Sequence, residues 1–379
     1  MNIEELYETV KEIRRDLHQI PEISFDLPKT SLYVKEKLES YGYEPISVAH
    51  TGWIAVIKGK SEEAVAFRAD MDALMVTEET GAEFASLHQG KMHACGHDGH
   101  MAMLLGFAKY LKSLDKLEKT VVLIFQPAEE SPGGARIIME TGILQGLQVR
   151  NIYGIHLYPG LPEGILGLAQ GPVMARSGEF DIKVEGQSSH GGQPHLGIDA
   201  LLAATQIISG VQTIISRGMD PLEPVVINIG TLHAGEARNI VAGLAEMTGT
   251  IRSYNDEVYF SIKEKLKVIC DGVMNMTGTK VSLEIRDFYP PVVNDEGLVE
   301  ELMKKLPKER YEVLKPLMTA EDFSCYQQEF RGVFMMLGTK REDLGWIYPL
   351  HNNHFNFDEK VLLKGIEAYD LVLEMEHIK

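Results

Sequence analysis

The residues best suited to chemistry are concentrated in the segment M-H-A-C-G-H-D-G-H at 92–100. It places one thiol and three imidazoles within eight residues, directly before a stretch of helical pattern. A thiolate combined with imidazole nitrogens suits a transition metal better than Mg²⁺ or Ca²⁺. Cys95 and His97 could both face one point in a loop and bind a metal there. The plainer alternative is a buried free cysteine beside surface histidines.

A pair of adjacent carboxylates, Glu129 and Glu130, follows the apolar strand-like run V-V-L-I-F. Functional groups of α/β proteins favour the carboxyl ends of strands. Two neighbouring carboxylates without a basic residue repel each other, and a nearby cation removes that conflict. A raised pKa on one of them would make it a general base. The alternative is a helix N-terminus, which also favours acidic residues.

Further candidate ligands stand singly at other positions. His156 ends the strand-like run N-I-Y-G-I-H-L, and His351 lies in P-L-H-N-N-H-F. Asp70 and Asp72 close another such run, where one of them could orient a metal-bound imidazole. The alternatives are a structural histidine and ordinary turn chemistry. A thiolate, imidazoles and carboxylates at successive strand ends are what a two-metal hydrolase requires, because two cations polarise a carbonyl and activate a shared water.

The elements that must position these residues follow from the spacing of apolar residues. Strand-like and helix-like runs alternate in the first half of the chain, which predicts an α/β domain whose mixed sheet is flanked by helices. A second pattern follows, in the order β-α-β-β-α-β of the split ferredoxin-like motif. The first pattern has strands at 52–58, 64–69, 119–126 and 151–157, and helices at 3–18, 29–42, 98–114 and 133–142; the second has strands at 178–186, 223–233, 243–254 and 280–288, and helices at 197–217 and 256–277.

Two domains are expected in a chain of 379 residues, because single cores rarely exceed roughly 300 residues. We predict a catalytic, metal-binding α/β domain formed by residues 1–176 and 291–379. Residues 177–290 would form an inserted α+β domain with a lid or dimerisation role. A cleft between two domains is the usual place for a ligand.

Composition and charge exclude several classes of partner. The 37 Lys+Arg against 55 Asp+Glu give a formal net charge of −18, which argues against binding nucleic acid or an anionic membrane. Three cysteines are too few and too uneven for a disulfide framework and fit a reducing compartment. No signal peptide or membrane span is evident, so the expected location is the cytoplasm.

Several motifs together resemble one family. This branch contains aminoacylases, hippurate hydrolases and indole-acetyl-amino-acid hydrolases, and it belongs to the dizinc carboxypeptidase-like metallopeptidases. The resemblance extends over nearly the whole chain. The matching pieces are R-R-D-L-H-Q-I-P-E at 14–22, F-R-A-D-M-D-A-L at 67–74, the 92–100 segment, F-Q-P-A-E-E at 125–130, G-I-H at 154–156, G-T-I-R at 249–252, T-A-E-D-F-S at 319–324 and L-H-N-N-H-F-N-F-D-E at 350–359.

The resemblance implies a role for each candidate. Cys95 would bridge two divalent ions, with His97 and His156 completing one site and Glu130 and His351 the other. Glu129 would be the general base and acid, and Asp72 would support the ligands. His190 would help to hold the oxyanion, often across a dimer interface, and Asn239 and Arg252 would position the substrate carboxylate.

The family pattern also selects one of two histidines as the metal ligand. This sequence departs from the pattern at two positions. The pattern puts the ligand four residues before an aromatic residue, so Phe355 selects His351 over His354. Met75 stands where the family usually has proline, and His354 is an additional imidazole near the expected metal. Both departures concern the surroundings of the site and leave the proposed catalytic groups in place.

The predicted function is hydrolysis of the amide bond of N-acetyl or aromatic-acyl amino acids, for example deacetylation of N-acetyldiaminopimelate or hydrolysis of hippurate. Zinc and manganese fit the mixed S/N/O ligands, with cobalt and nickel as further candidates. A homodimer is expected by analogy. Three alternatives stay open: a dipeptidase or carboxypeptidase, a non-catalytic metal or thiol sensor, and a hydrolase with Cys95 as nucleophile.

Overall fold

The computed structural model describes all 379 residues, which divide into two compact units. Unit 1 comprises Met1–Val173, Val292–Lys315 and Glu321–Lys379, and unit 2 comprises Met174–Pro291 and Pro316–Ala320. The segment Pro316–Ala320 is distant in sequence from the rest of unit 2, and a backbone hydrogen bond joins it to that unit. Ala175 donates its N–H to the carbonyl of Thr319 at 2.9 Å. The roles of the two parts as catalytic domain and lid stay predictions.

Unit 1 is built around a large mixed sheet of eight strands in the order β1-β2-β4-β3-β5-β14-β6-β13. Its centre is parallel, since β3 pairs in parallel with β4 and β5, and β5 with β14. Central strands covered on both faces consist of continuous apolar runs, as Val121–Phe125 does in β4. The strands are β1 (Ile46–Val48), β2 (Gly52–Ile57), β3 (Ser61–Asp70), β4 (Lys119–Gln126), β5 (Val149–Pro162), β6 (Leu166–Leu168), β13 (Tyr311–Val313) and β14 (Arg331–Lys340).

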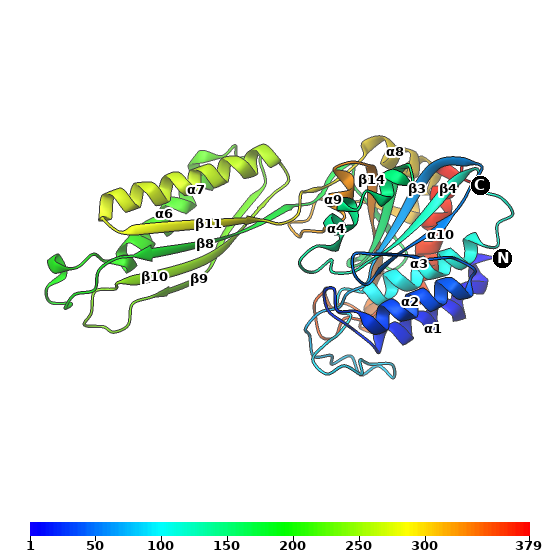
Figure 1. Ribbon diagram of the computed structural model, residues 1–379, viewed down its shortest axis with the longest axis horizontal. Helices are drawn as coiled ribbons and strands as arrows, with labels where there is room; N and C mark the ends of the chain where they lie inside the picture. The colour runs from blue at the N-terminus through cyan, green and yellow to red at the C-terminus, as the bar shows by residue number, and fades with distance from the viewer. The chain divides into compact units, whose positions relative to one another are not determined.

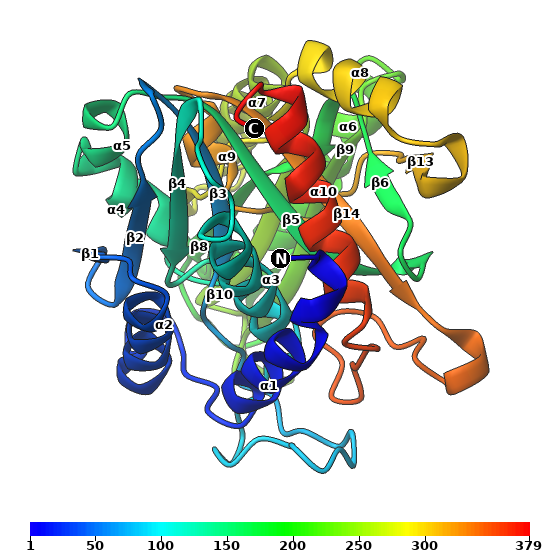
Figure 2. The ribbon, with the colours of Figure 1, turned by 90° about the vertical axis from the view of Figure 1, so that its right-hand side faces the viewer.

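Helices cover both faces of this sheet. Helices α1, α3 and α10 pack against one another on one face (Figure 2), and Figure 1 shows α4 and α9 on the other. Helix α3 is buried along nearly its whole length because it lies between the sheet and α1. No helix combines the length and apolarity that a membrane crossing needs. The helices are α1 (Tyr7–His18), α2 (Pro28–Ser40), α3 (His97–Leu111), α4 (Gly134–Glu140), α5 (Ile143–Gly146), α8 (Glu296–Lys305), α9 (Ser324–Gln327) and α10 (Val361–Met375).

The predicted elements of unit 1 are confirmed with shifts of a few residues at their ends. The exception is the predicted helix at 133–142, which the structure divides into α4 and α5. Gly142, with φ 69°, interrupts the helical conformation at that point. The sequence pattern did not define β14, although this strand lies beside β5 near the middle of the sheet.

Unit 2 contains a four-stranded antiparallel sheet in the order β11-β8-β10-β9, with two long helices packed against it (Figure 1). Burial alternates along β8, where Phe180, Ile182 and Val184 face the core. The predicted alternation of strands and helices is confirmed. In chain order the elements are β8 (Arg176–Glu185), α6 (Ala200–Gly218), β9 (Val225–Ala234), β10 (Leu244–Ser253), α7 (Asp256–Thr277) and β11 (Lys280–Asp287). A separate two-stranded sheet, which apart from Met174 belongs to unit 1, pairs β7 (Gly171–Met174) with β12 (Val292–Asn294).

Candidate metal centre

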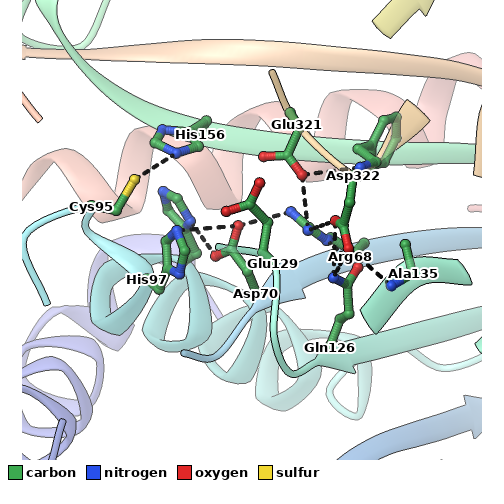
Figure 3. A network of polar contacts seen from close by, with 12 residues as sticks. Arg68, Asp70, Cys95, His97, Gln126, Glu129, Ala135, His156, Glu321 and Asp322 are labelled. Carbon is green, nitrogen blue, oxygen red and sulfur yellow. Dashed lines mark hydrogen bonds and ion pairs between the residues drawn. The ribbon is translucent and has the colours of Figure 1, made fainter. Parts of the chain in front are cut away.

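The parallel strands of unit 1 bring polar residues from separate parts of the sequence to one edge of the sheet. Asp70 is the last residue of β3 and Gln126 the last of β4, while His156 lies in the adjacent β5. The carboxyl ends of parallel strands lie at the same edge, where ligands of α/β proteins are commonly bound. Figure 3 shows these side chains converging there with Cys95 and His97.

Two groups of potential metal ligands meet at this edge and share one residue. The ligand atoms of Cys95, His97 and His156 lie within 4.8 Å of one another, and so do those of Cys95, Glu130 and His351. Cys95 Sγ is 3.4 Å from His156 Nε2, and His351 Nε2 is 3.2 Å from Glu130 Oε1. The structure therefore brings together all five residues for which the sequence predicted metal binding.

The hydrogen bonds of the two buried histidines orient their Nε2 atoms toward this group. Nδ1 of His97 lies 2.8 Å from the carbonyl oxygen of Asp72, and Nδ1 of His156 lies 2.7 Å from that of Leu157. A carbonyl oxygen only accepts, so each Nδ1 carries a proton, and each Nε2 is the nitrogen that can bind a metal once it is unprotonated. His97 Nε2 is buried and makes no hydrogen bond. Because an unsatisfied buried nitrogen is costly, a cation beside it would remove this cost, and the residues fit a metal.

Two residues with left-handed backbone conformations shape the loops that carry the ligands. Gly96, with φ 85°, precedes the first residue of α3 and separates Cys95 from His97. A Cβ atom at Gly96 would lie 3.2 Å from Leu157 Cδ1, so glycine is favoured by space as well as by conformation. His351 has φ 65°, and its N–H donates to the carbonyl of Ala94 at 2.8 Å. This backbone hydrogen bond joins the distant His351 loop to the Cys95 loop.

The carboxylate of Asp72 accepts backbone hydrogen bonds from both residues of the acidic pair, Glu129 and Glu130. Its Oδ1 accepts the backbone N–H of Glu129 at 2.9 Å, and its Oδ2 accepts that of Glu130 at 3.1 Å. The side chain of Asp72 is buried, so these charge-assisted bonds are shielded from water. Asp72 thereby orients both acidic residues through its carboxylate and His97 through its backbone carbonyl.

The site carries an excess of negative charge that favours protons or cations. Burial and the carboxylates of Glu321 and Glu130 raise the pKa of Glu129 well above its ordinary value. Burial, together with Glu130 and Glu129, also raises the pKa of the Cys95 thiol well above its usual range. Burial opposes a charge on His97, but Asp70 and Asp72 outweigh it and raise its pKa to about 10. A bound cation would relieve the same imbalance by replacing these protons.

A buried charge network that the sequence did not predict adjoins the ligands. The guanidinium of Arg68 donates to Asp70 at 2.8 Å, to Glu321 at 2.9 Å and to Asp322 at 2.7 Å (Figure 3). Burial opposes ionisation of Arg68, yet these three carboxylates raise its pKa further above its usual value. Its sequence signal was an arginine inside an otherwise apolar strand. The nearby group of Glu129, Glu321 and Asp322 resembles a metal site, but this guanidinium already supplies the positive charge.

The predicted catalytic residue His190 and the predicted substrate-binding residues Asn239 and Arg252 lie in unit 2. His190 is exposed, and its Nδ1 accepts the N–H of Gly192 at 3.1 Å, which leaves Nε2 as a donor. Asn239 is exposed beside it, since its carbonyl accepts the N–H of Gly191 at 2.7 Å. Arg252 is half-buried on β10, and its Nη1 donates to the Ile251 carbonyl at 3.0 Å.

The two departures from the family pattern have different surroundings. Met75 is 72% exposed. His354 is held by Glu79, whose carbonyl lies 2.8 Å from His354 Nδ1, and it belongs to none of the potential ligand groups.

Comparison with known proteins assigns the chain to a family. The family model described as peptidase family M20/M25/M40 matches residues 66–375. The chain is 38% identical to thermostable carboxypeptidase 1 of Saccharolobus solfataricus, over 98% of this chain and 96% of that protein. It is 37% identical to N-acetyldiaminopimelate deacetylase of Bacillus subtilis, over 97% of each. A solved Bacillus subtilis structure, described as a dinuclear metal-binding peptidase from the M20 family, matches with a TM-score of 0.85 and 33% identity over 99% of this chain and 100% of that one. The chain belongs to the peptidase family M20/M25/M40.

Proposed function

We propose that the protein is a two-metal amidohydrolase that cleaves the amide bond of N-acyl amino acids and releases a carboxylic acid and a free amino acid. The observation that carries the proposal is the pair of ligand groups that share Cys95, with Glu129 next to them. The names of relatives such as N-acetyldiaminopimelate deacetylase and N-acetylcysteine deacetylase support this substrate class.

The five candidate ligands divide into two sets in this proposal. Cys95 is common to both, His97 and His156 complete one, and Glu130 and His351 complete the other. Zinc or manganese suits this mixture of sulfur, nitrogen and oxygen, and cobalt and nickel are further candidates. When bound, the two ions would supply Lewis acidity for the amide carbonyl and for the attacking water.

Glu129 is the proton carrier of the proposed reaction. Its buried carboxylate takes a proton from the attacking water and gives it to the leaving nitrogen as the C–N bond breaks. Burial and the neighbouring carboxylates raise its pKa, which favours the step in which it takes up the proton. Asp72 orients the Glu129 backbone throughout.

Unit 2 contributes substrate recognition in this proposal. Its strand-helix order and the sheet order β11-β8-β10-β9 support a ferredoxin-like unit. Its roles as a lid and in a homodimer are proposed by analogy with the family. The Nε2–H of His190 donates to the oxyanion, while Asn239 and Arg252 bind the substrate carboxylate. The half-buried Arg252 guanidinium donates to a backbone carbonyl and to no carboxylate, which leaves donors for a ligand.

A carboxypeptidase is the second candidate, because two relatives at 38% identity carry that name. The two activities differ in the group on the acyl side of the bond. A deacetylase accepts a small acyl group, whereas a peptidase accepts an amino acid or a peptide. A nucleophilic Cys95 is less consistent with the site, because its surroundings raise the pKa of the thiol rather than lower it.

The decisive experiment measures hydrolysis of N-acetyl, N-benzoyl and unblocked dipeptide substrates with added zinc, manganese or cobalt. N-acyl amino acids should be hydrolysed with the higher kcat/KM. Glu129→Gln should lower kcat by about 10²–10⁴-fold while metal content stays near that of the wild type. Glu140→Gln, the same substitution on the exposed surface of α4, is the control. Retained turnover in Glu129→Gln, or turnover by metal-free protein, would overturn the mechanism.

A further inference from the structure

We propose that His100 is a positioning residue that holds His156 in its metal-binding orientation without binding a metal itself. This inference rests on the proposed two-metal function. It concerns a buried imidazole that the reaction does not use directly. His100 makes two hydrogen bonds, one on each ring nitrogen.

The first hydrogen bond anchors His100 to the charge network. Its Nδ1 lies 2.5 Å from Asp70 Oδ1, and Asp70 Oδ2 accepts from Arg68 Nη1 at 2.8 Å. Arg68 is in turn held by Glu321 and Asp322. The carboxylate of Asp70 is therefore fixed at both oxygens, and it fixes the plane of the His100 ring.

The second hydrogen bond connects His100 to the strand that carries His156. The backbone N–H of Leu157 donates to His100 Nε2 at 2.9 Å. The carbonyl of the same residue accepts Nδ1–H of His156 at 2.7 Å. Leu157 is thus held by His100 through its N–H and holds His156 through its carbonyl. The rings of His100 and His156 also contact each other edge to face, with centroids 4.5 Å apart.

These two hydrogen bonds also define the tautomer of His100. Nε2 accepts a backbone N–H, so the ring proton is on Nδ1, where Asp70 accepts it. Neither nitrogen retains a lone pair for a cation. His97 differs, because its Nε2 makes no hydrogen bond. The cluster of Asp70, His97 and His100 therefore contains one ligand and two supporting residues, although their polar atoms lie within 4.8 Å of one another.

Supporting residues of this kind act on metal binding through the ligand that they orient. Removing such a partner typically weakens metal affinity or activity by about 10–100-fold. The effect of His100 should be confined to the ligand set that contains His156. The other set, with Glu130 and His351, has no hydrogen bond to His100 and should bind metal nearly as before.

Three substitutions separate the two hydrogen bonds. The short amide of His100→Asn can donate to Asp70 but does not reach the Leu157 N–H. The longer amide of His100→Gln can accept from Leu157 but is poorly placed to donate to Asp70. His100→Leu removes both bonds at similar size. His93→Leu is the matched control, because His93 is a buried imidazole of the same segment whose two nitrogens make no hydrogen bond.

The experiment titrates metal-free protein with Zn²⁺ against a chromophoric chelator and with Co²⁺ by visible absorption. In His100→Leu one of the two binding steps should weaken about 10–100-fold and the other should change less than about twofold. His100→Gln should retain more affinity than His100→Asn, since it preserves the link to Leu157. His93→Leu should bind both ions within about twofold of the wild type. Urea unfolding of each metal-free variant checks that it is folded.

Several outcomes would overturn the inference. Unchanged affinities in all three His100 variants would show that the hydrogen bonds do not orient His156. Equal loss in His93→Leu would show a general packing effect. At saturating Co²⁺, a d–d absorption spectrum of His100→Gln that indicates one nitrogen ligand fewer than in the wild type would make His100 a direct ligand. Failure of the wild type to bind two ions would instead refute the proposed function.

Discussion

The side chain of Asp72 accepts the backbone N–H of Glu129 at 2.9 Å, with its second oxygen on the next amide. Asparagine has the same shape but only one acceptor oxygen, and its amide N–H₂ would face a backbone N–H. We expect Asp72→Asn to lower kcat/KM about 10–100-fold while the protein stays folded. Steady-state kinetics with metal analysis test this, and Asp115→Asn at an exposed position is the control. Wild-type kinetics in Asp72→Asn would contradict the supporting role.

Removal of metal should reduce stability as well as activity. A ligand that binds only the folded protein stabilises it by about 2.7 kcal/mol at a concentration 100 times its Kd. Treatment with a chelator should abolish hydrolysis and lower the melting temperature, and added zinc or manganese should restore both. Cys95→Ser replaces the thiolate common to both ligand sets with a weaker ligand. The melting temperature of this variant should therefore respond much less to the chelator. An equal response in this variant would argue against metal binding through Cys95.

Replacing Arg68 should lower the free energy of unfolding more than replacing most other residues of unit 1. Arg68→Met leaves Asp70, Glu321 and Asp322 buried without their cation. Breaking a buried ion pair from one side typically costs about 3–5 kcal/mol. Urea unfolding should show a loss of this size, whereas Arg217→Met on the exposed side of α6 should change stability little. Adding Glu321→Gln to Arg68→Met should restore part of the lost free energy of unfolding, because it removes one uncompensated charge.

The ion pair of His18 with Glu78, at 3.2 Å, should stabilise the protein most strongly in a defined pH range. Burial opposes ionisation of Glu78, but His18 lowers its pKa from 4.5 to about 2, so its contribution is present above pH 4.5 and is lost as the pH falls toward 2. Burial likewise opposes a charge on His18, but Asp98 and Glu78 raise its pKa above 6.5, so its contribution is present below pH 6.5 and is lost as the pH rises through the raised value.

The two limits together place the maximum between pH 4.5 and 6.5. A double-mutant cycle with His18→Gln and Glu78→Gln, measured by urea unfolding from pH 3 to 9, isolates the pair from the neighbouring Asp98. The coupling free energy should decrease on both sides of this range. A coupling that is constant with pH would mean that the interaction is not ionic.

Local sequence patterns were sufficient for most of the fold and for most of the candidate ligands. Apolar runs ending in Asp70 and Gln126 predicted strand ends correctly. His156 was also predicted at a strand end, but β5 continues to Pro162, and the parallel pairing of β3 with β4 and β5 is what brings His156 to the same edge. The H-A-C-G-H segment preceded a helix as expected. The choice of His351 came from the resemblance to a family, because nothing local distinguishes it from His354.

The tertiary structure decided which distant residues meet and which nitrogen of each histidine faces the site. Arg68 and Glu321 are 253 positions apart, and His351 reaches the site through a backbone bond to Ala94. Both nitrogens of His100 are already hydrogen-bonded, while His97 Nε2 is not. Residue types and spacing determine which groups can bind a metal. Burial and hydrogen-bond partners decide which of them have a lone pair left to do so, and only folding establishes those partners.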